Sequence, residues 1–470
     1  MSKKSIIFSP VTRLSGLLSV QATIESGQVV EANASGTMFR GFEWIMRDRH
    51  VTDAVYMTQR VCGICSLAHG AVASYLLDEL YDNDLTENAQ YLRNIMFAAD
   101  FLQNHIRHFY LFSLPDFARL PDRPPFHGQN LTDARLNPAD NERLVGHYFE
   151  AIKAAQESHQ LLALFGGKAP HQHSFVHGGV SVAPTADKIN QALALIRNIG
   201  DFVKSRMVPD TELIARVYSD YFLIGATPGL LLSFGLFKFG QKNERILWRP
   251  GVLVDGRHTI PQLELIEESV AASWYTDGPG KSDKSEEIKP DPYKPGAYTW
   301  VKSVQYAGRH FQVGPLARMI INGFYNGGTS TMDRIYARTL ETLLLTNLVQ
   351  EWLKKTEPGP PPIHQKKILV KNEATATTDA MRGALLHSAS IQDEKVARYN
   401  IITPTAWNFS PKDKSGSRGP VESALVGTEI IRPDLLFTIL GRTVRSFDPC
   451  MACATHVLDL KMNKESETVF

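Results

Sequence analysis

The sequence has few cysteines, almost no net charge and no long hydrophobic run, and each shortage excludes a class of protein. Only four of its 470 residues are cysteines, which is too few for a small secreted scaffold held by disulfides. Lysine and arginine total 50 against 49 aspartates and glutamates. A nucleic-acid partner would call for a basic excess, so composition gives no reason to expect one.

No segment has the length and composition of a transmembrane helix. The longest uncharged run, residues 221–237, contains three glycines and a proline, which is typical of a folded core. The first ten residues carry two lysines and few apolar side chains, so we expect no signal peptide on this chain. These features predict a globular protein without a membrane span.

Hydrophobic periodicity predicts a mainly helical protein that begins with a β-hairpin. Apolar and polar residues alternate over residues 18–24, and Ser26-Gly27 then turns the chain into a second strand over residues 28–34. Apolar residues three and four positions apart predict long helices, over residues 87–113, 140–165, 185–207 and 333–355. Residues 278–296 and 357–362 are rich in glycine or proline and read as loops. We expect one α+β body, predominantly helical, with small β elements.

All four cysteines fall in two C-x-x-C pairs near opposite ends of the chain. Cys62 and Cys65 form the first pair, and Cys450 and Cys453 form the second. Within such a pair both sulfurs can point to one side and share a metal ion. Two pairs brought together would offer four thiolates, a soft site suited to thiophilic transition metals. A metal site of this kind requires the two ends of the chain to meet.

Spacing alone leaves four explanations of the cysteines open. One is structural zinc, although zinc ribbons usually place their pairs about 15–20 residues apart. Another is a redox dithiol, which needs only one pair and a thioredoxin-like context that neither pair has. The cysteines could also be ordinary core residues. The fourth is a metal that serves catalysis or electron transfer.

The residues that flank the cysteines carry a resemblance to a known family. R-x-C-G-x-C at residues 60–65 and D-P-C-x-x-C-x-x-H at 448–456 resemble the paired motifs of the large, catalytic subunit of nickel–iron hydrogenases. The resemblance covers essentially the whole chain. Further blocks occur in the family's order: P-V-T-R at 10–13, F-R-G-F-E at 39–43, F-G-G-K at 165–168, V-G-P-L-A-R at 313–318 and R-G at 382–383.

The resemblance implies a nickel–iron centre that cleaves dihydrogen reversibly into two protons and two electrons. Nickel would be bound by Cys62, Cys65, Cys450 and Cys453. Cys65 and Cys453 would also bridge to an iron that carries carbon monoxide and cyanide. A terminal cysteine thiolate such as Cys450 would act as the base that takes up the proton, because metal binding keeps it deprotonated.

The resemblance also implies residues that surround the metals. Arg382 would hold its guanidinium over them, to polarise the open position or to act as a base, and Asp448 would orient that arginine. Asp116 would be another acid near the site, or else a helix or turn cap. His69 would form a hydrogen bond to a cysteine sulfur.

The C-terminal motif carries two further implications. Glu43 and His456 would be ligands of a separate magnesium or iron ion near the C-terminus. The family makes this subunit as a precursor that a dedicated protease cuts after the last motif histidine, and nickel-insertion proteins load it. We expect a single catalytic domain over residues 1–456 and removal of residues 457–470.

Three positions depart from the family pattern. Ser15 stands where a glutamate usually passes protons towards solvent, and a hydroxyl can relay a proton but cannot store one near neutral pH. Met381 replaces a rigid proline with a flexible thioether, and Gln312 replaces a glutamate. None of the three is a metal ligand, so they indicate a divergent branch.

The nickel–iron site would use every cysteine, so electrons would have to leave through another polypeptide. The resemblance implies an iron–sulfur small subunit, in a heterodimer or larger assembly. An export signal, if there is one, would lie on that partner, which leaves a cytoplasmic and a periplasmic or membrane-face location both open. The alternative function is a hydrogen-sensing or zinc-stabilised structural subunit of a redox complex.

Overall fold

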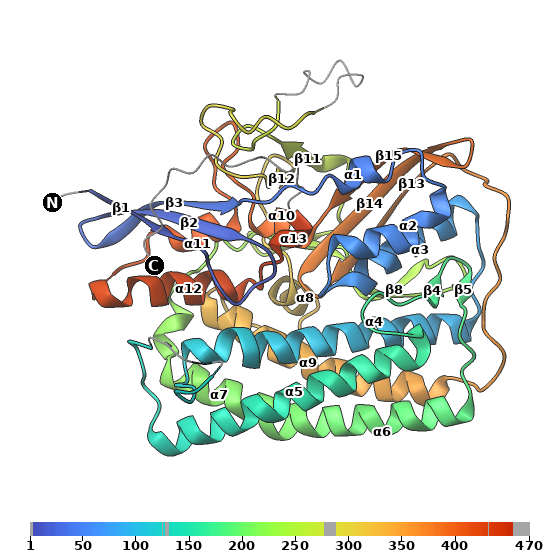
Figure 1. Ribbon diagram of the computed structural model, residues 1–470, viewed down its shortest axis with the longest axis horizontal. Helices are drawn as coiled ribbons and strands as arrows, with labels where there is room; N and C mark the ends of the chain where they lie inside the picture. The colour runs from blue at the N-terminus through green and yellow to red at the C-terminus, as the bar shows by residue number, and fades with distance from the viewer. Residues whose placement is uncertain (1–2, 125, 127–130, 277–287, 431, 455–470) are drawn as a thin grey trace.

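The computed structural model describes residues 3–124, 126, 131–276, 288–430 and 432–454. Figure 1 shows two layers, with long helices below and sheets with short helices above. The largest hydrophobic core cluster includes residues from Phe42 to Cys453, and a second large cluster joins the N-terminal sheet to residues near the C-terminus, from Val11 to Ala454. Among the described helices, none is both long and apolar enough to cross a bilayer.

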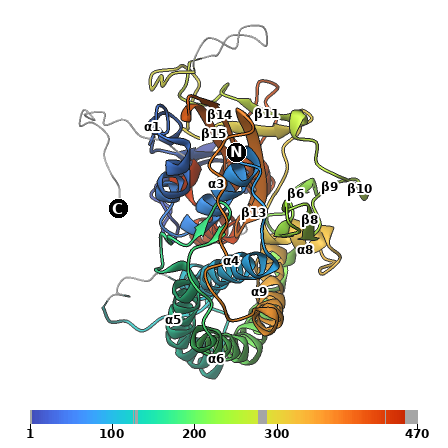
Figure 2. The ribbon, with the colours of Figure 1, turned by 90° about the vertical axis from the view of Figure 1, so that its right-hand side faces the viewer.

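Four long helices make the lower layer and are seen end-on in Figure 2. They are α4 (Glu87–Arg107), α5 (Pro138–Gly166), α6 (Ala186–Phe202) and α9 (Thr331–Lys355). Helix α4 packs against α5 and α9, and α6 packs against the same two helices. Each helix begins at a polar residue that accepts a hydrogen bond from the third backbone N–H of the helix, namely Thr86, Asn137, Thr185 and Ser330.

These helices confirm the predicted ones, except that one of them continues beyond its predicted end. The helix expected to end at Met207 passes through a π-helical turn, Val203–Met207, and continues as α7, Val208–Val217. Pro209, which has no backbone N–H, lies in the first turn of α7, directly after this π-helical turn. After α4, a π-helical turn, His108–Ser113, continues to the predicted end at Ser113, and a short 3₁₀ turn then leads to Asp116. Single π-helical turns of this kind occur within longer α-helical segments.

The predicted N-terminal hairpin is confirmed as β2 (Leu18–Glu25) and β3 (Gln28–Gly36), with β1 (Lys4–Phe8) beside β2. A second antiparallel sheet of β13 (Glu373–Ala380), β14 (Gly383–Gln392) and β15 (Lys395–Ile402) was not anticipated. Its first strand is made of alanine, threonine and acidic residues, and alanine and acids are depleted in strands. Its middle strand is buried on both faces over residues 383–387, so its sequence there lacks the alternation of apolar and polar residues that marks a half-exposed strand.

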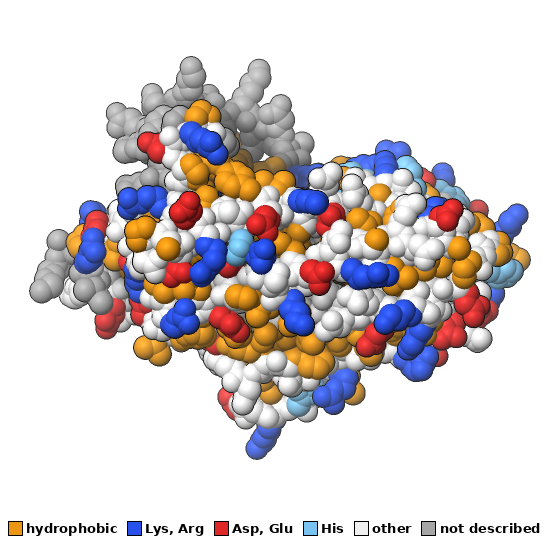
Figure 3. Space-filling view, turned by 90° about the horizontal axis from the view of Figure 1, so that it is seen from below, with side chains coloured by type: hydrophobic (Ala, Val, Ile, Leu, Met, Phe, Trp, Pro, Cys, Tyr) orange, Lys and Arg blue, Asp and Glu red, His pale blue; other side chains and the backbone are white. Residues whose placement is uncertain are grey.

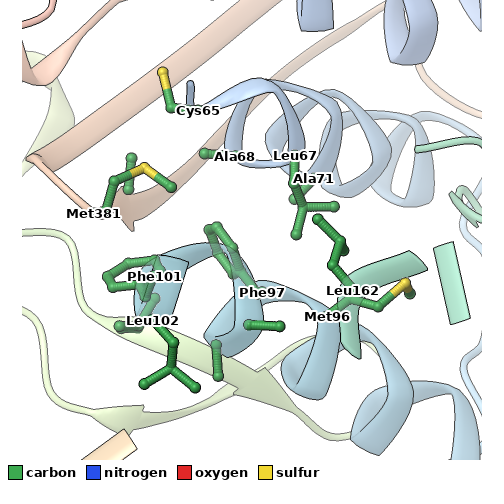
Figure 4. Close-up of a cluster of buried hydrophobic side chains, with 14 of the residues drawn as sticks. Cys65, Leu67, Ala68, Ala71, Met96, Phe97, Phe101, Leu102, Leu162 and Met381 are labelled. Carbon is green, nitrogen blue, oxygen red and sulfur yellow. The ribbon is translucent and has the colours of Figure 1, made fainter. Parts of the chain in front are cut away.

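Helix α3 (Ser66–Leu80) joins the two layers. Every residue of α3 except Glu79 is buried, and the helix packs on β13 and β14. Figure 4 shows side chains of α3 and α4 meeting between the layers, with Cys65 and Met381 at the edge of this cluster. The first cysteine pair therefore lies at the start of a fully buried helix, between the sheet and the helical layer.

The remaining elements are short and complete the upper layer and its edges. They are α1 (Phe42–Ile45), α2 (Ala54–Met57), α8 (Pro315–Ile321), α10 (Pro404–Asn408), α11 (Pro420–Leu425), α12 (Leu436–Ser446), α13 (Met451–Ala454), β4 (Phe175–Val176), β5 (Gly179–Val180), β6 (Leu231–Ser233), β7 (Leu236–Phe239), β8 (Arg245–Trp248), β9 (Gly251–Val254), β10 (Arg257–Thr259), β11 (Ile266–Ser269) and β12 (Ser303–Tyr306). Figure 3 shows the outer face of the helical layer, on which basic, acidic and apolar side chains are interspersed.

Candidate metal centre

The two cysteine pairs meet in the interior of the protein. All four sulfurs are buried and lie within 4.8 Å of one another. The Sγ atoms of Cys62 and Cys450 are 3.2 Å apart, and those of Cys65 and Cys453 are 3.3 Å apart. The structure therefore brings together the thiols that the sequence separates by almost its whole length.

Backbone contacts hold the second pair against the N-terminal segment. The N–H of Met451 donates to the carbonyl of Ser15 at 2.7 Å. Gly16 has a φ of +89°, and a side chain at this position would lie 2.6 Å from the backbone nitrogen of Ala452. Only glycine combines this backbone conformation with so close an approach. The two residues that closely follow the P-V-T-R block, Ser15 and Gly16, thus pack directly against the second cysteine pair.

Arg40 ties the two cysteine pairs to each other. Its guanidinium donates to the carbonyl of Ala452 at 3.1 Å and to that of Arg60 at 2.8 Å, and it also donates to the carbonyl of Val61. The acceptors lie directly before the first pair and inside the second. Five fixed donors make arginine suited to clamping several carbonyls at once. The F-R-G-F-E block therefore has a structural role beside the cysteines.

The electrostatics of the four thiols favour a bound cation. Burial raises the pKa of the Cys65 and Cys453 thiols well above the usual value. Burial would also raise the pKa of Cys450, but hydrogen bonds from the other three thiols and the charge of Arg382 lower it. Burial therefore opposes ionisation of Cys65 and Cys453 unless a cation is bound. A soft divalent cation would allow all four to ionise, so the donor set fits such a metal.

Arg382 lies in the turn between β13 and β14 and faces the second cysteine pair. Its Nε donates to the carbonyl of Asp448 at 2.8 Å, and its Nη2 donates to the carboxylate of Asp448 at 3.0 Å. Asn104 donates to the other carboxylate oxygen at 2.8 Å. The remaining nitrogen of Arg382, Nη1, is buried without a hydrogen-bond partner among the described residues. A buried donor of this kind suits an acceptor at the site.

The charge of Arg382 is permanent. Burial alone would lower the pKa of its guanidinium, but the charges of Asp448 and of the neighbouring cysteines outweigh burial and raise it. The group cannot release a proton near neutral pH. Of the two roles that the sequence left open for Arg382, polarising the site and acting as a base, the electrostatics favour the first.

A small enclosed cavity lies beside the cysteines. It is lined by residues of both cysteine pairs and of the β13–β14 turn, which include Cys65, His69, Met381, Arg382, Cys450 and Cys453. Met381 is fully buried, so the thioether that replaces the family's proline forms part of the cavity wall. The cavity suits small ligands rather than an organic substrate.

His69 lies one helical turn after Cys65 and lines this cavity. Its Nδ1 is 3.1 Å from Nε2 of His387, whose Nδ1 is 2.9 Å from the hydroxyl of Tyr399. Burial lowers the pKa of His387 well below its usual value, so this imidazole is neutral. The hydrogen bond from His69 to a cysteine sulfur stays a prediction. His387 and Tyr399 lie on β14 and β15, two strands that the sequence does not predict, so neither residue could be placed beside the site from the sequence.

Asp116 connects the N-terminal segment to helix α12. Its carboxylate accepts two hydrogen bonds of 2.7 Å from Arg445 and is also paired with Arg13. The Arg442 side chain donates to its backbone carbonyl at 3.0 Å. Burial would raise the pKa of Asp116, but Arg445 and Arg13 lower it. Asp116 does not line the described cavity, and its predicted place near the metals stays a prediction.

Replacing Asp116 with asparagine is expected to destabilise the protein by about 3–5 kcal/mol, because the buried Arg445 and the partly buried Arg13 lose their counter-charge. The pKa of Asp116 is lower in the folded protein, so its contribution is complete above the unfolded pKa of about 3.9 and is lost as the pH falls through the folded value. The thermal midpoint of Asp116→Asn should thus fall at neutral pH and approach that of the parent in acid. Asp434→Asn, which removes an exposed partner of Arg432, is the control and should change little. If both variants lowered the thermal midpoint equally, the stabilising role assigned to the Asp116 ion pairs would be contradicted.

Glu43 lies in α1, in a separate cluster of charged residues. Its carboxylate accepts a hydrogen bond from the backbone N–H of Ile401 at 3.1 Å and pairs with Lys302 at 3.4 Å. Lys302 also lies 3.5 Å from Glu268. His456, the other predicted ligand of the C-terminal ion, lies outside the described residues, as does the segment 457–470. The second metal site stays a prediction.

Comparison with known proteins places the chain among hydrogenases. A profile of the family described as nickel-dependent hydrogenase matches residues 40–122, 125–328 and 325–456. The chain is 34% identical to the periplasmic [NiFeSe] hydrogenase large subunit of Desulfomicrobium baculatum, over 98% of this chain and 97% of that one. It is 29% identical to the hydrogenase-2 large chain of Escherichia coli K12, with 98% of each covered.

A solved structure agrees with these sequence matches. The Ni-Fe-Se hydrogenase from D. vulgaris Hildenborough in the reduced state superposes with a TM-score of 0.91 at 34% identity. The match covers 97% of this chain and 100% of that one. The two-layer fold and the meeting of the chain ends are thus shared with a protein of known structure.

Proposed function

The chain belongs to the nickel-dependent hydrogenase family, and from this premise we propose that it is the catalytic subunit that cleaves dihydrogen reversibly into protons and electrons. The observation that carries the proposal is the group of four buried thiols within 4.8 Å, drawn from the two ends of the chain. A zinc clasp would account for the sulfurs. It would not account for the buried, unpartnered Nη1 of Arg382 beside them.

We infer that Cys62, Cys65, Cys450 and Cys453 hold nickel and that Cys65 and Cys453 also hold iron. Both of the latter line the cavity beside the cluster, which supports a second metal with small ligands, carbon monoxide and cyanide, on that side. When bound, the metals would supply Lewis-acid polarisation of dihydrogen and take up its electrons. The protein would contribute four soft ligands that stay deprotonated in the complex.

The residues around the metals would orient the substrate and move the proton. The Sγ of Cys450 would accept the proton, since Arg382 already favours its ionised form. Arg382 would present Nη1 to the cavity, and the two contacts from Asp448 would hold it there. His69 would fix the orientation of the Cys65 region through its contact with His387. The cavity walls would exclude bulk water.

We further infer one catalytic domain over residues 1–456, with an ion, magnesium or iron, held by Glu43 and His456. The hydrogen bond from Ile401 and the ion pair with Lys302 hold the Glu43 carboxylate in place, and a carboxylate is a ligand that suits a hard cation. Asp116 would act as a positioning residue, because it binds both Arg13 of the N-terminal segment and Arg445 of α12, the helix that precedes the second cysteine motif.

The C-terminal extension is expected to be absent from active protein. Cleavage by the maturation protease, after nickel-insertion proteins have acted, would leave His456 as the last residue. The intact mass of this chain in a nickel-loaded preparation should therefore end at His456. The same chain from cells grown without nickel is the control, and its mass should extend to Phe470. An active, nickel-loaded chain that ends at Phe470 would contradict the prediction.

Electrons would leave through an iron–sulfur small subunit, because the nickel–iron centre uses all four cysteines of the chain. The compartment would be set by that partner, and both the cytoplasm and the periplasmic or membrane face fit the proposal. The complex purified from its native host should oxidise dihydrogen with an artificial dye at an ordinary enzymatic rate, on the order of 10 per second or more. A hydrogen sensor would show only traces of this activity, which would reject catalysis as the main role.

A further inference from the structure

One face of helix α4 lies against the cysteine cluster. Gln103 donates from Nε2 to the carbonyl of Ile64, inside the first cysteine pair, at 3.4 Å. One turn earlier on the same face, Asp100 accepts a hydrogen bond from the same Nε2 at 3.0 Å. The neighbouring Asn104 binds Asp448. The spacing of three and four residues puts these side chains next to one another. Asp100 is thus joined to the cysteine loop through a single side chain.

The carboxyl group of Asp100 lacks the partners that a buried carboxylate normally has. The residue is 4% exposed, and its Oδ2 has no hydrogen-bond partner among the described residues. The Oε1 of Gln103 is also buried and unpartnered. Two unpartnered acceptors on adjacent side chains are suited to hold a water molecule, which can donate to both. When Oδ2 is protonated, its O–H would donate a hydrogen bond to the same water, so the neutral acid would have a partner as well.

The charges around Asp100 come from two elements. Arg107, two turns further along α4, and Arg382, from the β13–β14 turn, both favour the ionised carboxylate. Burial outweighs them and raises the pKa of Asp100 to about 7. Helix α5, which packs on α4, contributes His159, whose pKa burial and Arg107 lower to about 4. The group facing Arg107 from α5 is therefore neutral near pH 7.

Arg107 and His159 extend this polar path away from the cysteines. The positive charge of Arg107 lowers the pKa of Asp100. Burial lowers the pKa of Arg107 itself, while the charges of Asp448 and Cys62 raise it. Both Arg107 and His159 are only partly buried, whereas every residue of α4 from Leu92 to Ile106 is buried. Asp100 is thus coupled on one side to the cysteine loop through Gln103 and on the other to Arg107, which is partly exposed and also acts on His159.

We propose that Asp100 is the proton relay of this hydrogenase, which takes the proton from the cysteine thiols and passes it to solvent beside Arg107 and His159. In the step, an S–H bond of the cluster breaks, a water carries the proton, and an O–H bond forms at Oδ2 of Asp100. No electrons move with it, because they leave separately through the partner subunit. The carboxyl can store a proton, which the hydroxyl of Ser15 cannot. The proposal rests on the proposed function.

The test compares Asp100→Asn with Asp100→Glu in the complete complex. Asn keeps the size and the hydrogen bond to Gln103 but cannot titrate, whereas Glu restores the acid. Asp210→Asn is the matched control, because Asp210, in α7, is another buried carboxyl with a raised pKa that binds Tyr110 and His147 and does not line the cavity beside the cysteines. Nickel content, infrared difference spectra in H2O and D2O, and the pH profile of dihydrogen oxidation are measured for each.

The parent should show the C=O stretch of a protonated carboxylic acid that titrates near pH 7 and shifts in D2O. Oxidation should rise with pH through this range, since the ionised carboxylate is the acceptor. Asp100→Asn should keep its nickel, lose the infrared band and this limb of the profile, and turn over about 10²-fold more slowly. Asp100→Glu should regain the band and most of the rate, and Asp210→Asn should retain both.

Two results would overturn the relay. One is an Asp100→Asn complex with the parent's rate and pH profile. The other is a slow Asp100→Asn whose band is retained, or whose defect Glu does not rescue, since either would make the residue structural. A parent complex without nickel or activity would instead reject the proposed function itself, so the two failures are distinguishable.

Discussion

Replacing any one of the four cysteines with serine is expected to remove nickel from the protein and abolish dihydrogen cleavage. The four sulfurs lie within 4.8 Å and all are buried, so no other described side chain can take the place of a lost ligand. A serine hydroxyl is a hard donor that stays protonated near neutral pH, whereas nickel in such a site requires soft thiolates. We expect a loss of at least about 10²-fold in both metal affinity and rate, beyond the 10–100-fold effects usual for residues that only orient ligands.

The matched control is Ile64→Val, which changes the residue between Cys62 and Cys65 without altering a donor atom. Its backbone N–H, which donates to the Sγ of Cys62 at 3.4 Å, is unaffected. This variant should retain nickel and most of its activity. A cysteine-to-serine variant with the parent's nickel content would contradict the assignment of that cysteine.

Replacing Arg382 with methionine is expected to lower turnover by about 10²–10³-fold while nickel is retained. The guanidinium is buried, permanently charged and held by Asp448, so its Nη1 is preorganised towards the cavity. Loss of one such preorganised donor costs about this much in other enzymes. Rate and nickel content are measured together on the purified complex, because the prediction separates them.

Arg382→Lys discriminates between charge and geometry. Lysine keeps the positive charge but cannot reproduce both contacts with Asp448 and still present a donor to the cavity. Its rate should fall between those of the parent and the methionine variant. If Arg382→Met retained a rate within about twofold of the parent, the arginine would have only a structural role.

Much of the fold could be predicted from the sequence because its long helices are amphipathic and well capped. The hairpin of β2 and β3 and the helices α4, α5 and α9 are confirmed. The sheet of β13, β14 and β15 was missed, because its alanine-rich first strand has low strand propensity. His387 and Tyr399 were missed with it. The continuation of α6 into α7 was missed because Pro209 resembles a helix end.

The four cysteines were recognisable because their spacing and flanking residues are both distinctive. The partners of Asp116 were not, because Arg13 and Arg445 are brought to it only by tertiary structure. Asp100 was not singled out either. It lies off the apolar stripe of its helix, where an acid normally faces solvent, but α4 is surrounded on all sides over this stretch. Burial of a whole helix is a property of the assembled layers.

Elemental analysis for nickel and zinc, on the complex purified from its native host, tests the account most directly. Iron is less informative, because the clusters of a partner subunit would dominate its signal. We predict about one nickel per chain and no stoichiometric zinc, since four buried thiolates beside a fixed arginine form a soft site that fits nickel. Zinc without nickel would contradict the account and make the four cysteines a structural clasp between the two ends of the chain.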